Sequence, residues 1–206
     1  MIINNLELIA PMMPLESLTS PAKYFCLLQI VRRAKDHKGE KVKEGPIAAY
    51  YIKNEKHLRK IMPEVIALCE LYGARAYINV SHKDFDKFQK TVLLKIASLV
   101  CEGGLQNPRK ILNSAAGTIT APHPVWIIDV DDMTLKDSIL AWCDAYFKIE
   151  NDVRYYLLGT IPTKQGCHLL VRPFNLRLFS SLFNNVDVHK NSMGTLLYYP
   201  DSIKQD

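Results

Sequence analysis

The sequence predicts a mixed α+β fold, rich in alternating strands and helices and built from two modules. Short apolar runs with β-branched and aromatic residues alternate with helix-periodic segments along the chain. The second half follows a strand-helix-strand-strand-helix-strand order, and a proline-rich stretch at residues 121–124 precedes it. The length of 206 residues and the hydrophobic content of 48% allow a sizeable core.

Three parts of the chain are expected. Residues 1–22 contain three prolines and are predicted to form an irregular lead-in. Residues 23–124 form an N-terminal αβ module and residues 125–206 a second module, and the two are expected to pack as one compact domain.

The N-terminal module begins with two strands, at 24–33 and 47–53, joined as a hairpin by a charged loop. A helix over 58–72 follows, which Gly73 ends, and Pro63 is tolerable there only near the first turn. A strand at 75–80 completes the sheet.

Ser81 and Asp84 predict a capping box for a second helix, which continues up to Gly103. An apolar stripe on this helix is expected to face the core. Its members are Phe85, Phe88, Val92, Ile96 and Val100. A short helix at 109–118 and a linker at 121–124 lead to the second module.

The second module is predicted to contain strands and helices in the order of a ferredoxin-like unit, as in RNA recognition motifs. The expected helices cover 135–148 and 176–183. The expected strands are 127–131, 154–159, 167–172, 186–188 and 195–199.

Three of these strands each place two acidic, imidazole or basic side chains on one face, because alternate residues share a face. The pairs are Asp129 with Asp131, His168 with Arg172, and Asp187 with His189. If the strands lie side by side, their polar faces form one patch. A single Asp-x-Asp is often only a solvated turn, and Asp132 is assigned to that class, beside Thr134 at the start of a helix. The combination and order of the motifs favour a site.

This order of motifs resembles the archaeo-eukaryotic primase superfamily, which includes primase-polymerases, over residues 125–199. The resemblance implies a two-module fold with an RNA-recognition-motif-like catalytic module. It implies that Asp129, Asp131 and Asp187 are the catalytic residues and hold two divalent ions, Mg²⁺ or Mn²⁺. It also implies that His168 contacts the phosphates of the incoming nucleotide, in the motif Gly166-Cys167-His168.

Nucleotidyl transfer explains why such residues are wanted. Two divalent ions stabilise the entering and leaving oxygens, and carboxylates suit Mg²⁺ as hard oxygen ligands. His168 and Lys164 are expected to donate to the β- and γ-phosphates, and Gly166 allows a close backbone approach. Further nucleotide-binding candidates are Thr163, Arg172, His189, Lys190, Arg75 and Asn79. For the last four, a surface turn or partial strand exposure is the alternative explanation.

A single-stranded DNA template is the expected partner beside nucleoside triphosphates. The net charge of +5 is a weak indication of a polyanionic partner, but basic residues crowd the segment from 23 to 60. Arg32, Arg33 and Lys35 are the candidate template contacts. A solvated hairpin tip over 35–44 is the alternative for Lys35.

The five cysteines are scattered, with no C-x-x-C pair, so no structural zinc is expected and most are predicted to be small buried hydrophobes. The N-terminus lacks the features of a signal peptide, and no apolar run approaches the ~20 residues of a membrane span. These observations predict a cytoplasmic protein without a membrane partner.

The function expected from the sequence is that of a DNA primase or primase-polymerase domain that makes or extends primers from NTPs or dNTPs. Two alternatives stay open: a non-catalytic nucleic-acid-binding module of a replication complex, and a metal-dependent nuclease. A helicase or another replication protein is a candidate partner. The sequence leaves open the choice of sugar, and whether synthesis starts without a primer.

Overall fold

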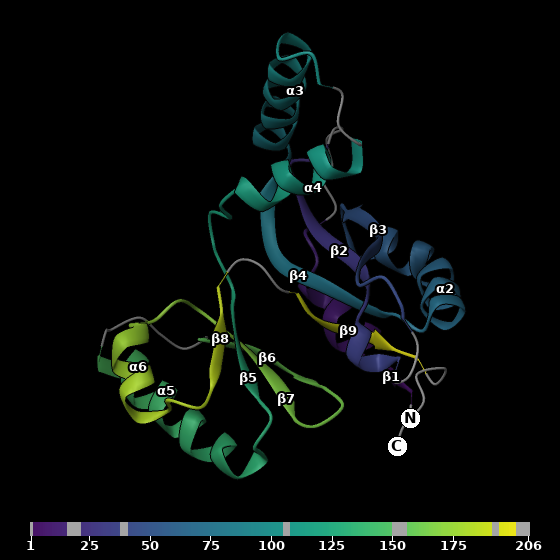
Figure 1. Cartoon of the computed structure of the whole chain (residues 1–206). Helices are drawn as coiled ribbons and strands as arrows, with labels where there is room; N and C mark the ends of the chain where they lie inside the picture. Colours follow the sequence, from purple (N-terminus) through teal and green to yellow (C-terminus); the bar gives the residue numbers. More distant parts are fainter. Residues whose placement is uncertain are drawn as a thin grey trace.

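The computed structural model describes residues 2–15, 22–37, 41–104, 108–149, 156–190 and 194–200, apart from the side chain of Arg109. It confirms the α+β class, with two antiparallel sheets (Figure 1). Sheet A has the strand order β1-β9-β4-β2-β3, and sheet B the order β6-β7-β5-β8.

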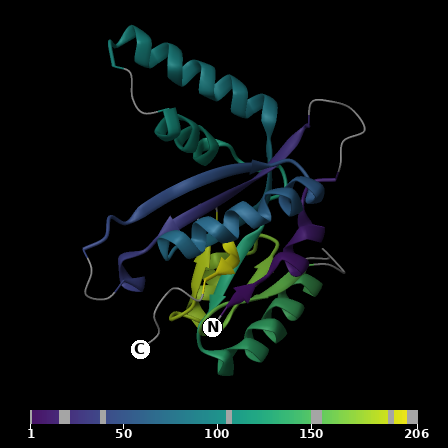
Figure 2. The same ribbon diagram turned by 90° about the vertical axis from the view of Figure 1, so that its right-hand side faces the viewer.

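Sheet A contains the predicted hairpin and the strand that follows it. Its strands are β1 (Ile3–Asn4), β2 (Tyr24–Arg32), β3 (Gly45–Ile52), β4 (Arg75–Asp84) and β9 (Thr195–Tyr199). A large buried cluster joins this sheet to α1 (Leu6–Ile9), to a 3₁₀ turn, η1 (Ala10–Met12), and to α2 (Glu55–Tyr72). In Figure 2, α2 runs along the sheet. Gly73 ends α2 in the left-handed conformation, as predicted, but Pro63 lies in the helix interior rather than near its first turn.

Sheet B is the core of the second module. Its strands are β5 (Trp126–Val130), β6 (Leu157–Pro162), β7 (Cys167–Val171) and β8 (Asp187–His189), and its helices are α5 (Lys136–Ile149) and α6 (Leu176–Leu182). Ile128 and Val130 pack with both helices, whereas Ile127 belongs to the buried cluster that includes sheet A. Alternation along β5 therefore joins one face of sheet B to its helices and the other face to sheet A.

The strand at 195–199 lies in sheet A, between β1 and β4, and not in the second module as expected from the sequence. All five residues of β9 are buried, and a largely apolar run of this kind is compatible with a buried strand in either sheet. The approach is tight, because a Cβ on Gly194 would lie 2.4 Å from the carbonyl carbon of Ile78. The last described strand of the chain therefore returns to the first module.

The segment expected to be an irregular lead-in takes part in the core. Ile9, Ala10 and Met13 are buried in the cluster that includes sheet A. The side-chain amide of Asn5 donates to the carbonyl of Pro162 in β6 at 2.9 Å and to that of Leu196 in β9 at 2.8 Å. One buried amide thus connects the two sheets.

Helix α3 (Phe85–Cys101) projects from the body, with α4 (Pro108–Thr118) beside it (Figures 1 and 2). Asp84 caps α3 by accepting from the backbone N–H of Lys87, whereas Ser81 lies in β4, so the predicted capping box is wrong. The apolar stripe predicted to face the core does so only in the first turns of the helix. Phe88 is buried, whereas Ile96 and Val100 are 40% and 61% exposed, because the helix runs beyond the sheet.

Helix α5 begins after a 3₁₀ turn, η3 (Met133–Leu135), which Asp132 caps by accepting from the backbone and hydroxyl of Thr134. Asp132 is therefore a local capping residue, in agreement with its assignment from the sequence. Strand β6 begins at Leu157, and residues 154 and 155 of the strand predicted there lie outside the described ranges. No helix in the described parts of the chain is long and apolar enough to cross a membrane.

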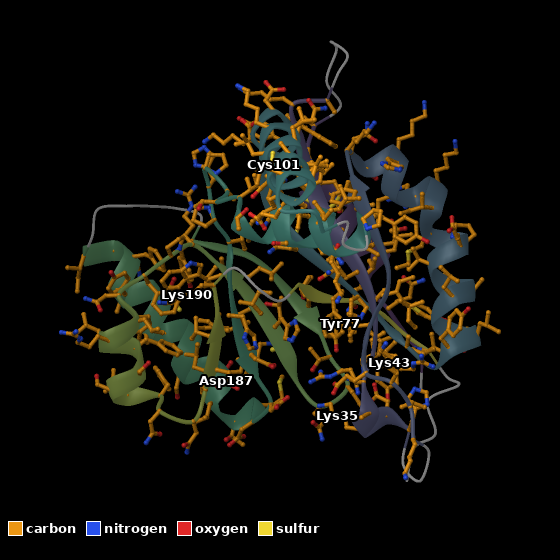
Figure 3. All side chains as sticks on the ribbon, turned by 45° about the horizontal axis from the view of Figure 1, so that its top comes forward. Lys35, Lys43, Tyr77, Cys101, Asp187 and Lys190 are labelled. Atoms are coloured by element: carbon orange, nitrogen blue, oxygen red, sulfur yellow. The ribbon has the colours of Figure 1, made fainter. Side chains whose placement is uncertain are left out.

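The thiols provide a test of this packing. Cys101 lies at the end of α3 (Figure 3) and is exposed, whereas the other four cysteines are buried. Burial raises the pKa of Cys69 and Cys143 to about 12, which suppresses the reactive thiolate. We expect a disulfide reagent to label one thiol quickly in the native protein and all five after unfolding in guanidinium. Rapid labelling of two or more native thiols would contradict the structure.

Candidate active site

A cavity of about 280 Å³ lies where the two sheets face each other. From sheet A and the segment after β2 it is lined by Arg33, Lys35, Arg75, Tyr77 and Leu196. From sheet B and its turns it is lined by Asp129, Asp131, Thr163, Lys164, Gln165, His168, Asp187 and His189. Figure 3 shows Asp187 on the side of sheet B, and Tyr77 and Lys35 on the other side.

The pairing register of β5 places three polar side chains in one row. Asp129 lies opposite His168 of β7 and also opposite Asp187 of β8. Side chains directly opposite each other on one face of a sheet have Cβ atoms about 4.5–5.5 Å apart. The register therefore brings Asp129, His168 and Asp187 of the predicted patch together, and the roles assigned to these residues stay predictions.

Asp131 follows the last residue of β5 and is exposed to solvent. It lines the main cavity together with Asp129 and Asp187, and the same three aspartates line a neighbouring hollow of about 200 Å³. Among the described residues, those that line this second hollow include no lysine or arginine. The carboxylates thus lie between a cavity with several basic side chains and a hollow without them.

Two imidazoles flank the carboxylate of Asp129. Its oxygens lie 3.4 Å from Nε2 of His168 and 3.9 Å from Nε2 of His189. Contact with His189 lowers the pKa of Asp129, with smaller favourable effects of His168 and Lys35, while partial burial opposes them. Asp129 is therefore ionised at neutral pH.

The two histidines differ in their electrostatics. Burial lowers the pKa of His168, whereas contact with Asp129 raises the pKa of His189. Nδ1 of His168 is hydrogen-bonded to the buried hydroxyl of Thr195 in β9 at 3.0 Å. The ring of His168 is therefore fixed between a carboxylate of sheet B and a hydroxyl of sheet A.

A tight turn presents Thr163 and Lys164 to the cavity. The backbone N–H of Thr163 donates to the carbonyl of Gly166 at 2.9 Å, and the N–H of Gly166 donates to the Thr163 hydroxyl at 3.0 Å. A Cβ on Gly166 would lie 1.9 Å from the carbonyl oxygen of Val130, so only glycine fits at this approach. The turn is thereby held against the end of β5, next to Asp131.

Basic side chains of the first module face the carboxylates. Nη1 of Arg33 donates to the Tyr77 hydroxyl at 3.2 Å, and Arg75 is paired with Asp36. Burial lowers the pKa of Lys35, as do Arg33 and Arg75, while Asp36 and Asp131 raise it. The cavity therefore has an acidic side, formed by Asp129, Asp131 and Asp187, and a facing basic side, formed by Arg33, Lys35 and Arg75, which we call the basic roof.

Five residues with predicted contacts are not among those that line this cavity: Arg32, Asn79, Gly166, Arg172 and Lys190. Gly166 approaches the backbone of β5 instead. Successive strand residues face opposite ways, so Arg32 points away from the cavity that Arg33 lines. Its side chain donates instead to the carbonyl of Lys43 at 3.2 Å. Arg172 lies four residues from His168, roughly 13 Å along an extended chain, and is exposed.

The other two of these residues have local partners. The side chain of Asn79 accepts from the backbone N–H of Ser81 at 2.9 Å. The ammonium of Lys190 lies 4.9 Å from the centre of the Trp126 ring. Both contacts explain the residues without a nucleotide.

Sequence reasoning did not select Gln165, Tyr77, Leu196 or Asp36. Tyr77 shares a strand face with Arg75, so the same alternation could have selected it. Gln165 lies inside the recognised turn. Neither Leu196 nor Asp36 carries a local signal, because each reaches the site through a contact with a distant segment.

The donor set fits a hard divalent cation. Three aspartates line one cavity, and carboxylate oxygens are the ligands that Mg²⁺ and Mn²⁺ prefer. Among the described residues, no three His, Cys, Asp or Glu side chains are already arranged as a metal cluster. A Mg²⁺ ion at such a site usually keeps waters and takes phosphate oxygens of the substrate as further ligands.

The chemistry that this cavity supports is defined by its own residues. No protein-family model, curated protein or solved structure matches the chain. The geometry provides an acidic row, a fixed imidazole, a glycine turn with a lysine, and a basic roof from the opposite sheet.

The close approach of the glycine turn can be tested by substitution. We expect Gly166→Ala to lower the free energy of unfolding by about 1–3 kcal/mol, because the new Cβ overlaps the backbone of β5. Gly117→Ala is the matched control. A Cβ there meets nothing within 4 Å in helix α4, and we expect a gain of about 0.5–1 kcal/mol. Urea denaturation measures both, and equal stability of the two variants would contradict the packing.

Proposed function

We propose that this protein is a primase or primase-polymerase catalytic domain that performs template-directed nucleotidyl transfer. The observation that carries the proposal is one cavity that joins Asp129, Asp131 and Asp187 to His168, Lys164 and the basic roof. A nucleoside triphosphate brings several negative charges to carboxylates that repel it. Divalent ions and basic side chains in the same cavity are what such a substrate requires.

The connection of sheet B supports the resemblance to the primase superfamily. Strands β5, β6, β7 and β8, with α5 and α6, follow the β-α-β-β-α-β order. The two β-α-β units interlock, because β7 lies between β5 and β6, and β5 lies between β7 and β8. This is the pattern of a split β-α-β unit. The residues of the three motifs lie on the central strands, on β8 and at the adjoining turn.

The residues of the cavity have separate roles in this proposal. Asp129, Asp131 and Asp187 would hold the divalent ions, which supply charge stabilisation for the attacking hydroxyl and the leaving pyrophosphate. His168, positioned by Thr195, faces the cavity with Nε2 and donates to a phosphate oxygen. Lys164 donates to the triphosphate from the glycine turn, which the hydrogen bond between Gly166 and the Thr163 hydroxyl holds in place.

The hollow on the other side of the carboxylates suits a different ligand. Its described lining includes no basic side chain, so it lacks the cations that a triphosphate requires. It nevertheless borders the same three aspartates. We assign the triphosphate to the basic cavity and the 3′ end of the growing strand to this hollow, so that the two reactants meet at the carboxylates.

The cavity weighs against both alternatives. A module that only binds nucleic acid gains nothing from three carboxylates in one cavity, because they repel phosphates. A metal-dependent nuclease needs the carboxylates but has less use for a basic cavity large enough for a triphosphate. A single-stranded DNA template, Mg²⁺ or Mn²⁺, and a helicase or other replication partner remain parts of the proposal.

The carboxylate row leads to a direct test. We expect Asp129→Asn to reduce primer synthesis and extension by roughly 10³-fold or more, because it removes a charge that holds the ions. The assay uses a labelled primer on a single-stranded template, with NTPs or dNTPs and Mg²⁺ or Mn²⁺. Asp137→Asn, an exposed position in the first turn of α5, is the matched control and should keep full activity.

Other outcomes of this assay distinguish the alternatives. Full synthesis by Asp129→Asn would refute the proposal. Degradation of labelled DNA without added nucleotides would favour the nuclease. Tight binding of single strands that needs no metal, without any incorporation, would favour the binding module.

A further inference from the structure

Lys35 reaches the cavity from a short segment that follows β2. This segment, Arg33–His37, which we call the strap, contains a 3₁₀ turn, η2 (Ala34–Asp36). Arg33 and Lys35 line the cavity, while Asp36 and His37 contact the region where α2 ends and β4 begins. The strap therefore has two residues directed to the cavity and two that attach it to the fold.

The attachment through Asp36 is a buried ion pair. Arg75, the first residue of β4, donates from Nε and from an Nη to the two oxygens of Asp36, the first at 2.7 Å. The side chains of Arg75 and Asp36 are only 11% and 4% exposed. The Arg75 guanidinium also lies 4.8 Å from the centre of the Tyr199 ring. A two-point contact of this kind fixes direction as well as distance.

The second attachment involves His37 and the end of α2. Nε2 of His37 is hydrogen-bonded to the carbonyl of Gly73 at 2.9 Å. Gly73 has a φ of 53°, and a Cβ there would lie 2.7 Å from Cε1 of His37. The glycine that ends α2 thus also makes room for the imidazole. Both attachments follow Lys35 in the chain, and β2 ends just before the strap begins.

These attachments place Lys35 opposite the carboxylates. Lys35 lines the same cavity as Asp129, Asp131 and Asp187, from the side of the first module. Arg33 is directed inward by its hydrogen bond to the Tyr77 hydroxyl. Because Arg75 is already paired with Asp36, its charge is largely neutralised by its partner. Lys35 and Arg33 are then the cations that the strap contributes to the cavity.

We propose that the strap is a phosphate clamp, in which Lys35 binds the triphosphate of the incoming nucleotide and Asp36 and Arg75 are positioning residues that hold it there. This inference rests on the proposed nucleotidyl transfer. It changes two expectations from the sequence, since Lys35 contacts the nucleotide rather than the template, and Arg75 supports the strap rather than binding the nucleotide.

The physical reason is preorganisation. An exposed lysine has a long, mobile side chain, and part of the binding free energy is lost when it is ordered. A backbone held at two points removes the backbone part of this cost before the nucleotide arrives, so that only the side chain of Lys35 remains to be ordered. A charge-assisted contact to phosphate then strengthens binding by roughly 10- to 100-fold.

The test measures binding and turnover in the full chain. Calorimetry with inorganic tripolyphosphate and Mg²⁺ gives Kd, and primer extension gives KM for the nucleotide and kcat. We expect Lys35→Gln to raise both Kd and KM by roughly 10- to 100-fold and to change kcat by less than ~3-fold. Lys43→Gln is the matched control, because Lys43 is also exposed but does not line the cavity.

A double-mutant cycle tests the positioning role. We expect Asp36→Asn to raise KM as Lys35→Gln does, and the double variant to be no worse than Lys35→Gln alone, because Asp36 acts through Lys35. Asp36→Glu, which keeps the charge, should recover most of the affinity. Full additivity in the cycle would overturn the positioning role.

The buried pair makes loss of folding a risk for Asp36→Asn, and circular dichroism checks it. If that variant does not fold, Lys35→Gln and His37→Ala carry the test, and unchanged Kd and KM in both would overturn the clamp. Failure of the clamp is distinguishable from failure of the proposed function. If Asp129→Asn abolishes synthesis while Lys35→Gln keeps the native KM, only the clamp is wrong.

Discussion

The register of β5 between β7 and β8 is the constraint on which the candidate site depends. It places Asp129 opposite both His168 and Asp187, and a slip of one residue would turn Asp129 to the other face of the sheet. Ile128 and Val130 prevent such a slip, because they are buried against α5 and α6. The apolar half of the strand therefore fixes the position of its polar half.

The cavity also requires that the two sheets stay together. Strand β9 returns from the second module to sheet A, and Thr195 at its start is hydrogen-bonded to His168 of sheet B. The amide of Asn5 joins β6 to β9 through two carbonyls. The carboxylates of the site lie on the sheet B side together with Lys164, whereas Arg33, Lys35 and Arg75 come from the first module, so the complete cavity depends on such contacts.

The sequence was informative where the signal is local. Alternation in β5, β7 and β8 predicted the acidic row, and glycines predicted the end of α2 and the turn before Cys167. Pairing partners and burial over long distances have no local signal. The apolar run of β9 is compatible with a buried strand in either sheet. The apolar stripe of α3 resembles that of a core helix, although Val100 is exposed. The Asp36–Arg75 pair joins segments that are distant in the sequence. For the same reason, five of the predicted binding residues are not among those that line the cavity.

The two charge sets of the cavity also stabilise each other without a substrate. Neighbouring carboxylates repel, which favours protonation and weakens a cation site. His189 and Lys35 oppose this at Asp129, whose pKa is lowered by both. Lys35 interacts in addition with Asp131. In the proposed reaction, divalent ions would take over the neutralisation of the carboxylates, and the lysine would become available to a phosphate. One cation would then stabilise the free site and bind the substrate, which gives a physical reason for a basic strap opposite an acidic row.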